Sequence, residues 1–144
     1  MNHPEAVIGA IIFNPKNEVL LCKSSKWNNK YVVPGGHIEL GESMQEALIR
    51  EVLEETQLHI YEPVLVCVKE NIFYKVDNEV KHYILFDFIC KTSSYDVVLN
   101  DEAEVFCWVK LDDIFTYDLD VFTRHFFHAF MDEKSKRIPI LYNI

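Results

Sequence analysis

Three segments of this chain are apolar on both faces of a potential β-strand, and they constrain the fold more than any other feature. The segments are Ala6 to Phe13, Val64 to Val68 and Tyr83 to Cys90. A strand with one face in water alternates apolar and polar side chains, so a continuous apolar run indicates a strand covered on both faces. Helices must then lie on both sides of the sheet. This predicts an α/β fold, namely an α/β/α sandwich around a mixed β-sheet.

Shorter segments supply the other strands. The residues Asn14-Pro15-Lys16-Asn17 are typical of a type I turn and precede an apolar stretch at Val19 to Cys22, which predicts a hairpin. Tyr31 to Val33 is predicted as a short strand that stops at Pro34-Gly35-Gly36. Phe106 to Val109 is predicted as a further strand.

Two helices are expected. Ser43 is followed three residues later by Glu46, which matches a capping box, and neither Gly nor Pro interrupts the sequence up to about Thr56. From Leu119 onward, apolar residues fall on one helical stripe and predict an amphipathic C-terminal helix. No linker or repeat divides the 144 residues, so residues 1–144 are expected to form a single compact domain.

The net charge limits the classes of partner. The chain has 23 acidic and 14 basic residues, a formal charge of −9. Long nucleic acids and anionic membranes attract clustered Lys and Arg, so neither is expected as a partner. Residues 36–58 carry a net charge of −5 and residues 95–118 carry −6, which places the negative charge in two short stretches.

The cysteine pattern bears on the compartment. Cys22, Cys67, Cys90 and Cys107 are far apart and lie in or beside apolar runs. They are therefore expected to be reduced core residues of a cytoplasmic protein. No apolar run approaches the ~20 residues that a membrane helix needs.

The helix that begins at Ser43 has two distinct faces. An acidic face with like charges three and four residues apart weakens a helix by ~0.2–0.5 kcal/mol per pair. Carboxylates are the ligands that Mg²⁺ and Mn²⁺ prefer, so a bound divalent cation would reverse this repulsion, whereas the simpler alternative is a solvated acidic surface. The apolar face holds Leu48, Ile49, Val52 and Leu53, and the charged face holds Arg50, Glu51, Glu54 and Glu55.

The loop before this helix makes the pattern more specific. From Gly36 the sequence is GHIELGESMQEALIREVLEETQL. It resembles the Nudix box, G-x5-E-x7-R-E-U-x-E-E-x-G-U with U a bulky aliphatic residue, at every fixed position except one. The first hairpin, the YVVPGG entry and the closing helix are also similar to a complete Nudix domain, with its loop and helix at residues 35–57.

The one departure is Gln57, which stands where the family has Gly. That Gly normally ends the helix in a left-handed turn, a conformation that costs other residues ~1–2 kcal/mol. How the helix ends at Gln57 is therefore open. The residues that match the family's metal ligands precede this position.

The resemblance implies a Mg²⁺- or Mn²⁺-dependent pyrophosphohydrolase, which cleaves a diphosphate bond in a nucleoside diphosphate linked to another group. By matching position, Glu51 and Glu55 would bind the metal directly, Glu54 directly or through water, and the carbonyl of Gly35 would be a further ligand. Arg50 would orient the carboxylates through charge-assisted hydrogen bonds.

The general base is left open between Glu51 and an acid on a later loop, where Glu102 and Glu104 are the candidates. Substrate contacts are the least specific part of the pattern. Lys23, Tyr31 and His37 are candidate substrate-binding residues, each with ordinary core or surface packing as the alternative.

The expected partner is a small nucleotide diphosphate derivative, and a homodimer is compatible with the sequence. The residues do not decide among nucleoside triphosphates, ADP-ribose, sugar nucleotides and dinucleoside polyphosphates. A Nudix domain that binds nucleotides without catalysis is a further alternative, although such a domain would be expected to lose one of the glutamates.

Overall fold

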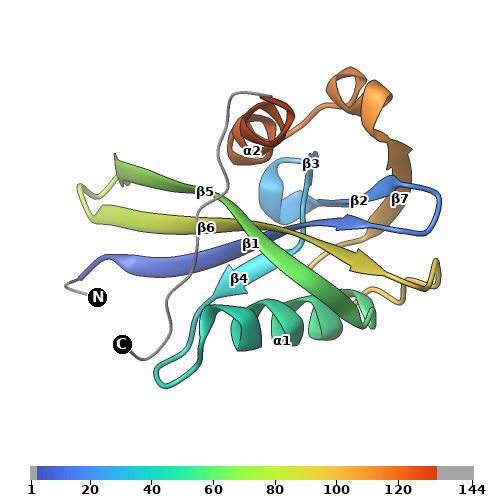
Figure 1. Ribbon diagram of the computed structural model, residues 1–144. Helices are drawn as coiled ribbons and strands as arrows, with labels where there is room; N and C mark the ends of the chain where they lie inside the picture. The colour runs from blue at the N-terminus through green and yellow to red at the C-terminus, as the bar shows by residue number, and fades with distance from the viewer. Residues whose placement is uncertain (1–2, 133–144) are drawn as a thin grey trace.

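The computed structural model describes residues 3–132, so residues 1–2 and 133–144 of the predicted domain lie outside the described part. A β-sheet lies between α1 on one face and α2 on the other (Figure 1). The α/β/α sandwich expected from the two-sided apolar strands is confirmed. The strands are β1 (Glu5–Phe13), β2 (Glu18–Ser24), β3 (Lys30–Val32), β4 (Gly35–His37), β5 (Ile60–Tyr74), β6 (Val80–Thr92) and β7 (Val105–Lys110). The helices are α1 (Met44–Thr56), α2 (Val121–Met131) and the short 3-10 segments η1 (Ser25–Trp27) and η2 (Leu111–Thr116).

The sheet is mixed, and β1 pairs with different strands along its length. Its order is β3-β2-β1-β6-β5, with β4 paired to β1 and β7 paired to β2. β1 runs parallel to β6, and the other pairs are antiparallel. β1 pairs with β2 at Phe13 and Val19, beside the predicted turn, and with β4 across Val7–Gly9. The β2–β3 part of the sheet thus diverges from the β1–β6–β5 part.

Each face of the sheet has its own hydrophobic core, which explains why the central strands are apolar on both faces. Alternate side chains of β1 enter opposite cores, as the two-residue repeat of a strand requires. The core under α1 includes Ile8, Leu48, Val52 and Phe88, and the core under α2 includes Ile11, Leu21, Phe126 and Phe127.

The prediction for β5 was only partly right. β5 is much longer than Val64 to Val68, and the side chains of these two valines are 39% and 45% exposed. Leu65 and Val66, between them, are buried. β5 is the last strand in the sheet order, and an edge strand is less completely covered than a central one.

β3 stops before Pro34, as predicted, and the glycines that follow form a separate short strand, β4, which the sequence did not predict. Gly9 and Gly35 face each other in the β1–β4 pair. A Cβ atom at Gly35 would collide with the carbonyl oxygen of Ile8, so only glycine allows this close approach.

Both ends of α1 follow from local sequence. The Ser43 hydroxyl accepts from the Glu46 N–H at 3.1 Å and the Glu46 carboxylate accepts from the Ser43 N–H at 3.3 Å, which confirms the capping box. Gln57 adopts the left-handed conformation, with φ of 63°, and its N–H donates to the Leu53 carbonyl at 2.9 Å. The helix therefore ends as it would with glycine, although a side chain is present.

The cysteines behave as core residues. All four are reduced. Burial raises the pKa of the Cys22 and Cys90 thiols to about 12, so both stay protonated at neutral pH. Within residues 3–132, no helix is long and apolar enough to cross a membrane.

Candidate active site

Arg50 organises the polar face of α1. Its Nε and Nη2 donate to the two carboxylate oxygens of Glu42 at 2.6 and 2.9 Å, and Nη2 also donates to the His37 carbonyl at 3.0 Å. Its Nη1 donates to Glu51 at 3.0 Å and to Glu54 at 3.4 Å. The hydrogen bonds from Arg50 hold the pKa of Glu42 below its usual range. Arg50 thereby links α1 to β4 and to the loop between them.

Two glutamates of α1 lie against the glycines of β4. The Gly35 N–H donates to Glu55 Oε2 at 3.0 Å. A Cβ atom at Gly36 would overlap the Glu51 carboxylate, so this carboxylate rests directly on bare backbone. Burial, with the neighbouring charge of Glu51, raises the pKa of Glu55 to about 8. Burial also raises the pKa of Glu51, while Arg50 opposes that rise.

These contacts permit a test of whether the predicted metal ligands fit a divalent cation. In the range 3–132, no group of three or more His, Cys, Asp or Glu side chains has already converged on one metal position. Glu51 and Glu54 turn to Arg50, and Gly35 contacts Glu55 through its N–H rather than its carbonyl. The donor set nevertheless fits a hard cation, because it gathers buried carboxylates whose charges repel one another.

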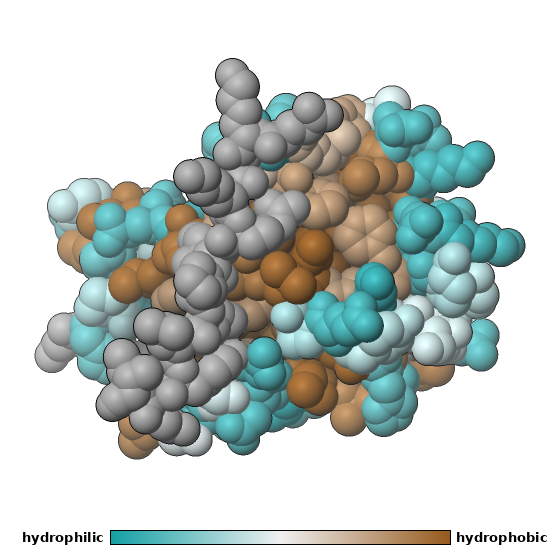
Figure 2. Space-filling view, viewed as in Figure 1, coloured by the Kyte–Doolittle hydropathy of each residue, from teal (hydrophilic) through white to brown (hydrophobic). Residues whose placement is uncertain are grey.

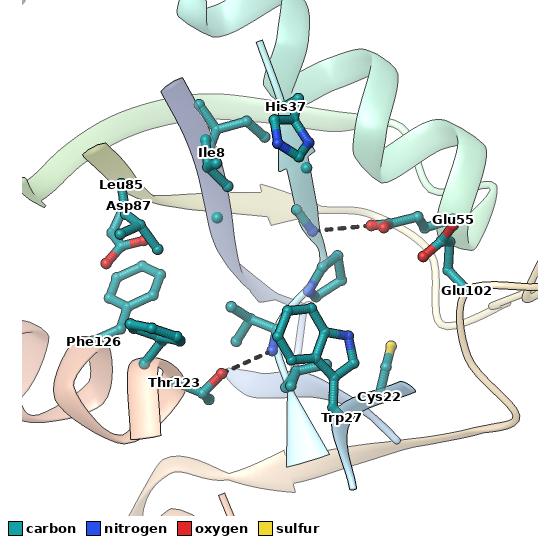
Figure 3. A pocket seen from close by; sticks show the side chains of 18 of the residues that line it. Ile8, Cys22, Trp27, His37, Glu55, Leu85, Asp87, Glu102, Thr123 and Phe126 are labelled. Carbon is teal, nitrogen blue, oxygen red and sulfur yellow. Dashed lines mark hydrogen bonds between the residues drawn. The ribbon is translucent and has the colours of Figure 1, made fainter. Parts of the chain in front are cut away.

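A cleft of about 410 Å³ begins beside these glutamates. Glu55 and Glu102 line one end and Asp87 lines the other (Figure 3). Lys69 also lines the cleft and contacts Asp87. Trp27 of η1 stands between the two ends (Figure 3). Most other lining side chains are apolar, and hydrophobic surface gathers between α2 and α1 on the face shown in Figure 2. An apolar cleft with a few placed polar groups is the usual form of a small-molecule site.

The structure separates the two loop acids that were candidate bases. Glu102 lines the cleft and forms an ion pair with Lys26 at 3.4 Å. Its charge contributes to the raised pKa of Glu51 and of Glu55. Both oxygens of Glu104 instead accept hydrogen bonds from Ser25, one from its N–H and one from its hydroxyl, each at 3.0 Å. Glu104 thus anchors η1, and it does not line the cleft.

The candidate substrate contacts also separate. His37 lines the cleft and pairs with Glu5 at 2.9 Å. Lys23 and Tyr31 do not line it. The Lys23 ammonium lies over the Tyr31 ring, 5.3 Å from its centroid, and that ring packs against Tyr117 on the α2 side. Alternation along β2 turns Lys23 away from the cleft, so this geometry gives no support to substrate contacts by Lys23 and Tyr31.

Sequence reasoning missed the polar pair at the far end of the cleft. Asp87 is 2% exposed and lies in the middle of the apolar run Tyr83 to Cys90. A charged residue within a fully buried strand is rare unless it is paired, and this was the available signal. Its partner Lys69, on β5, had no comparable signal because the outer part of that strand is partly exposed.

Comparisons with known proteins agree with this geometry. A model of the NUDIX domain matches residues 3–130. The nucleoside triphosphatase NudI of Salmonella schwarzengrund is 35% identical over 74% of this chain and 82% of its own length. The crystal structure of a MutT protein from Methanosarcina mazei Go1 has a TM-score of 0.73 at 28% identity, covering 94% of this chain and 99% of that one.

A more distant structure shows the fold alone. The NUDIX domain of Shewanella oneidensis NrtR, solved in complex with ADP ribose, has a TM-score of 0.72 at 16% identity and covers 90% of this chain and 87% of that one. The domain match spans nearly all of the described residues, and the Nudix box lies where α1 meets the glycines of β4. The chain therefore belongs to the Nudix family.

Proposed function

We propose that this chain is a divalent-cation-dependent pyrophosphohydrolase that cleaves a phosphoanhydride bond in a nucleoside triphosphate or a related nucleoside diphosphate derivative. One observation carries the proposal. The partly buried Glu55 lines one end of a cleft that is otherwise mainly apolar, and the partly buried Glu51 rests on Gly36, which also lines this cleft. A nucleotide has the matching division into an anionic phosphate chain and a flat, largely apolar base.

The carboxylates would hold the cation. Glu51, Glu54 and Glu55, together with the Gly35 carbonyl, are the proposed ligands, and Mg²⁺ or Mn²⁺ is the proposed ion. When bound, such a cation supplies positive charge against the phosphate oxygens and activates water as a nucleophile. Arg50 keeps the carboxylates in place through its hydrogen bonds, which bridge α1 and the preceding loop.

Glu102 is the proposed acceptor of the proton that the attacking water loses. It lines the cleft on the same side as Glu55, where a carboxylate can accept a proton from a water molecule that lies between it and the substrate. Water attacks phosphorus, its proton passes to the carboxylate, and the bond from phosphorus to the bridging oxygen breaks. The departing phosphate group keeps the electron pair of that bond. Glu51 is the alternative base.

Two features support the finer assignments. The similarity to a nucleoside triphosphatase favours a triphosphate over ADP-ribose, sugar nucleotides and dinucleoside polyphosphates. Four reduced cysteines are typical of a reducing compartment, so we place the enzyme in the cytoplasm.

The test is hydrolysis of a panel of nucleoside triphosphates, ADP-ribose, sugar nucleotides and dinucleotides with Mg²⁺ or Mn²⁺, analysed by product. The products identify the bond that is cut. Glu51→Gln and Glu55→Gln are each expected to lower kcat by a factor on the order of 10³ or more, because each removes a negative charge from the cation site.

Glu46→Gln is the matched control. It lies on the same helix, and Gln serves the capping box as well as Glu does. Its kcat should stay within about threefold of wild type. Near-normal turnover in both cleft variants, or equal losses in all three, would refute the assignment of the cation site.

A further inference from the structure

The far end of the cleft contains an ion pair in an apolar setting. Lys69 Nζ lies 2.7 Å from Asp87 Oδ2, and the two side chains are 19% and 3% exposed. The ammonium also donates to the Phe122 carbonyl at 2.8 Å and lies 5.5 Å from the centre of the Phe126 ring. Desolvation of two charges offsets most of their attraction, so stability alone is a poor reason for such a pair.

The two oxygens of Asp87 differ in their surroundings. Lys69 contacts Oδ2, and the Cys67 thiol donates to the same oxygen at 3.6 Å. Oδ1 is turned toward Gly9, where a Cβ atom would stand 3.0 Å from it. The contacts that anchor the pair therefore use Oδ2, whereas Oδ1 faces Gly9, which also lines the cleft and places no side chain over this oxygen.

The position of Oδ1 within the cleft indicates its ligand. It lies at the end away from Glu55 and Glu102, between the apolar side chains Leu85 and Phe126 (Figure 3). If the phosphates of a nucleotide lie beside the glutamates, its base reaches this end. Burial raises the pKa of Asp87, and the neighbouring Lys69 ammonium opposes that rise. In its ionised form the carboxylate can only accept hydrogen bonds, so it requires an N–H group on the ligand.

We propose that Asp87 determines base specificity: its Oδ1 accepts a hydrogen bond from an N–H on the edge of the nucleobase, and Gly9 provides access to it. The proposal rests on the proposed function, because it assigns the base end of the same cleft. The substrate class is a nucleoside polyphosphate whose base has an edge N–H. Lys69 is a positioning residue that holds Oδ2 and so orients the carboxylate.

The first test uses the wild-type enzyme alone. Each of the four common deoxynucleoside triphosphates is compared with an analogue in which methyl groups replace the edge N–H hydrogens. For the preferred base, methylation should raise KM at least about tenfold and leave kcat within about threefold, because the lost hydrogen bond is to a charged, desolvated acceptor. Equal KM values for the parent and methylated substrates would overturn the proposal.

The second test uses Gly9→Ala, whose methyl group would stand 3.0 Å from Oδ1, so that it covers this oxygen and displaces the Asp87 side chain by a few tenths of an ångström. Its added methyl group would meet Val33 and Phe126 only at ordinary contact distances of 3.8 and 4.0 Å, so the fold should be retained. We expect KM for the preferred nucleotide to rise about tenfold with kcat nearly unchanged. We also expect the penalty for methylation to shrink, since the two changes remove the same interaction.

Asp87→Asn is the companion variant, and Glu70→Gln is its control. Glu70 forms an ion pair with His82 at 2.9 Å between the same two strands but outside the cleft lining. Asp87→Asn should reproduce the KM effect of Gly9→Ala, whereas Glu70→Gln should not change KM. A full methylation penalty in Gly9→Ala, or a loss confined to kcat, would show that Asp87 supports the fold without contacting the base.

Failure of the proposed function gives a different result. In that case the wild-type enzyme hydrolyses none of the triphosphates. Binding of the same nucleotides, followed by the fluorescence of Trp27 in the cleft, then decides the role of Asp87. Equal binding of parent and methylated nucleotides in that assay would overturn the proposal that Asp87 contacts the base.

Discussion

Glu55→Gln should stabilise the metal-free protein at alkaline pH while it abolishes most activity. The Glu55 carboxyl is mostly buried, and its pKa is raised to about 8 from an ordinary value of 4.5. In the unfolded chain the same group ionises near its ordinary value. Its contribution to stability is therefore fully present below about pH 4.5 and is lost as the pH rises through about 8.

The magnitude follows from this shift. Each unit is worth about 1.4 kcal/mol, so the free energy of unfolding should fall by up to about 4 to 5 kcal/mol between the two limits. For 144 residues this corresponds to a decrease of more than about 10 °C in Tm. A Gln at position 55 does not titrate, and its amide oxygen can still accept from the Gly35 N–H.

The assay is urea unfolding in the presence of a chelator, followed by tryptophan fluorescence. At about pH 5 the wild-type and Glu55→Gln proteins should have similar stability, and at about pH 9 the variant should be more stable by several kcal/mol. Mg²⁺ should restore the wild type at high pH and have much less effect on the variant. The exposed Glu46→Gln change should leave the pH profile unaltered.

Parallel pH profiles for wild type and Glu55→Gln would refute the reasoning. They would mean that the carboxyl is solvated in the metal-free protein, and that no electrostatic cost is available for a cation to relieve. A variant that is less stable than wild type at every pH would show instead that the Glu55 carboxylate is needed for folding.

The remaining predictions concern the cleft and the end of α1. Glu102→Gln should lower kcat about 100-fold or more at neutral pH. Glu104→Gln should mainly loosen η1 and change kcat less than about tenfold. Equal effects of the two variants in steady-state kinetics would count against Glu102 as the base. Gln57→Gly should relieve the strain of the left-handed conformation and raise Tm by about 2–3 °C in thermal denaturation, after allowance for the greater freedom of glycine in the unfolded chain. The control Gln57→Ala should not raise Tm. A lower Tm in the glycine variant would contradict the left-handed conformation at residue 57. Nucleotide binding should quench fluorescence in Trp108→Phe but not in Trp27→Phe, since Trp27 lines the cleft and Trp108 does not; quenching retained in Trp27→Phe would place the base elsewhere.

The distribution of negative charge along the chain indicated part of the site before the structure was known. The overall charge of −9 argues against anionic partners. Its distribution along the chain, however, pointed to the stretch that contains Glu51 and Glu55 and to the loop that contains Glu102. The structure places the second stretch beside the first at one end of the cleft. An acidic protein can therefore take a polyphosphate substrate when cations offset the local charge.

The sequence by itself determined the features that depend on short spacings. The capping box and the two-sided central strands follow from repeats of two to four residues, because the backbone geometry of helices and strands makes those repeats predictive. The apolar face of α1 was predicted only in part, since Leu48 and Val52 are buried but Ile49 is 44% exposed. The Nudix box belongs to this group in part, since Glu51, Glu54 and Glu55 lie on adjacent turns of α1.

Only the tertiary structure decided which of two near neighbours enters the cleft. Glu102 and Glu104 are equivalent in sequence, and η1 binds the second of them. The Lys69–Asp87 pair became apparent only once β5 lay beside β6. Long-range strand pairing brings such groups together, and it depends on the packing of the whole sheet rather than on any local spacing.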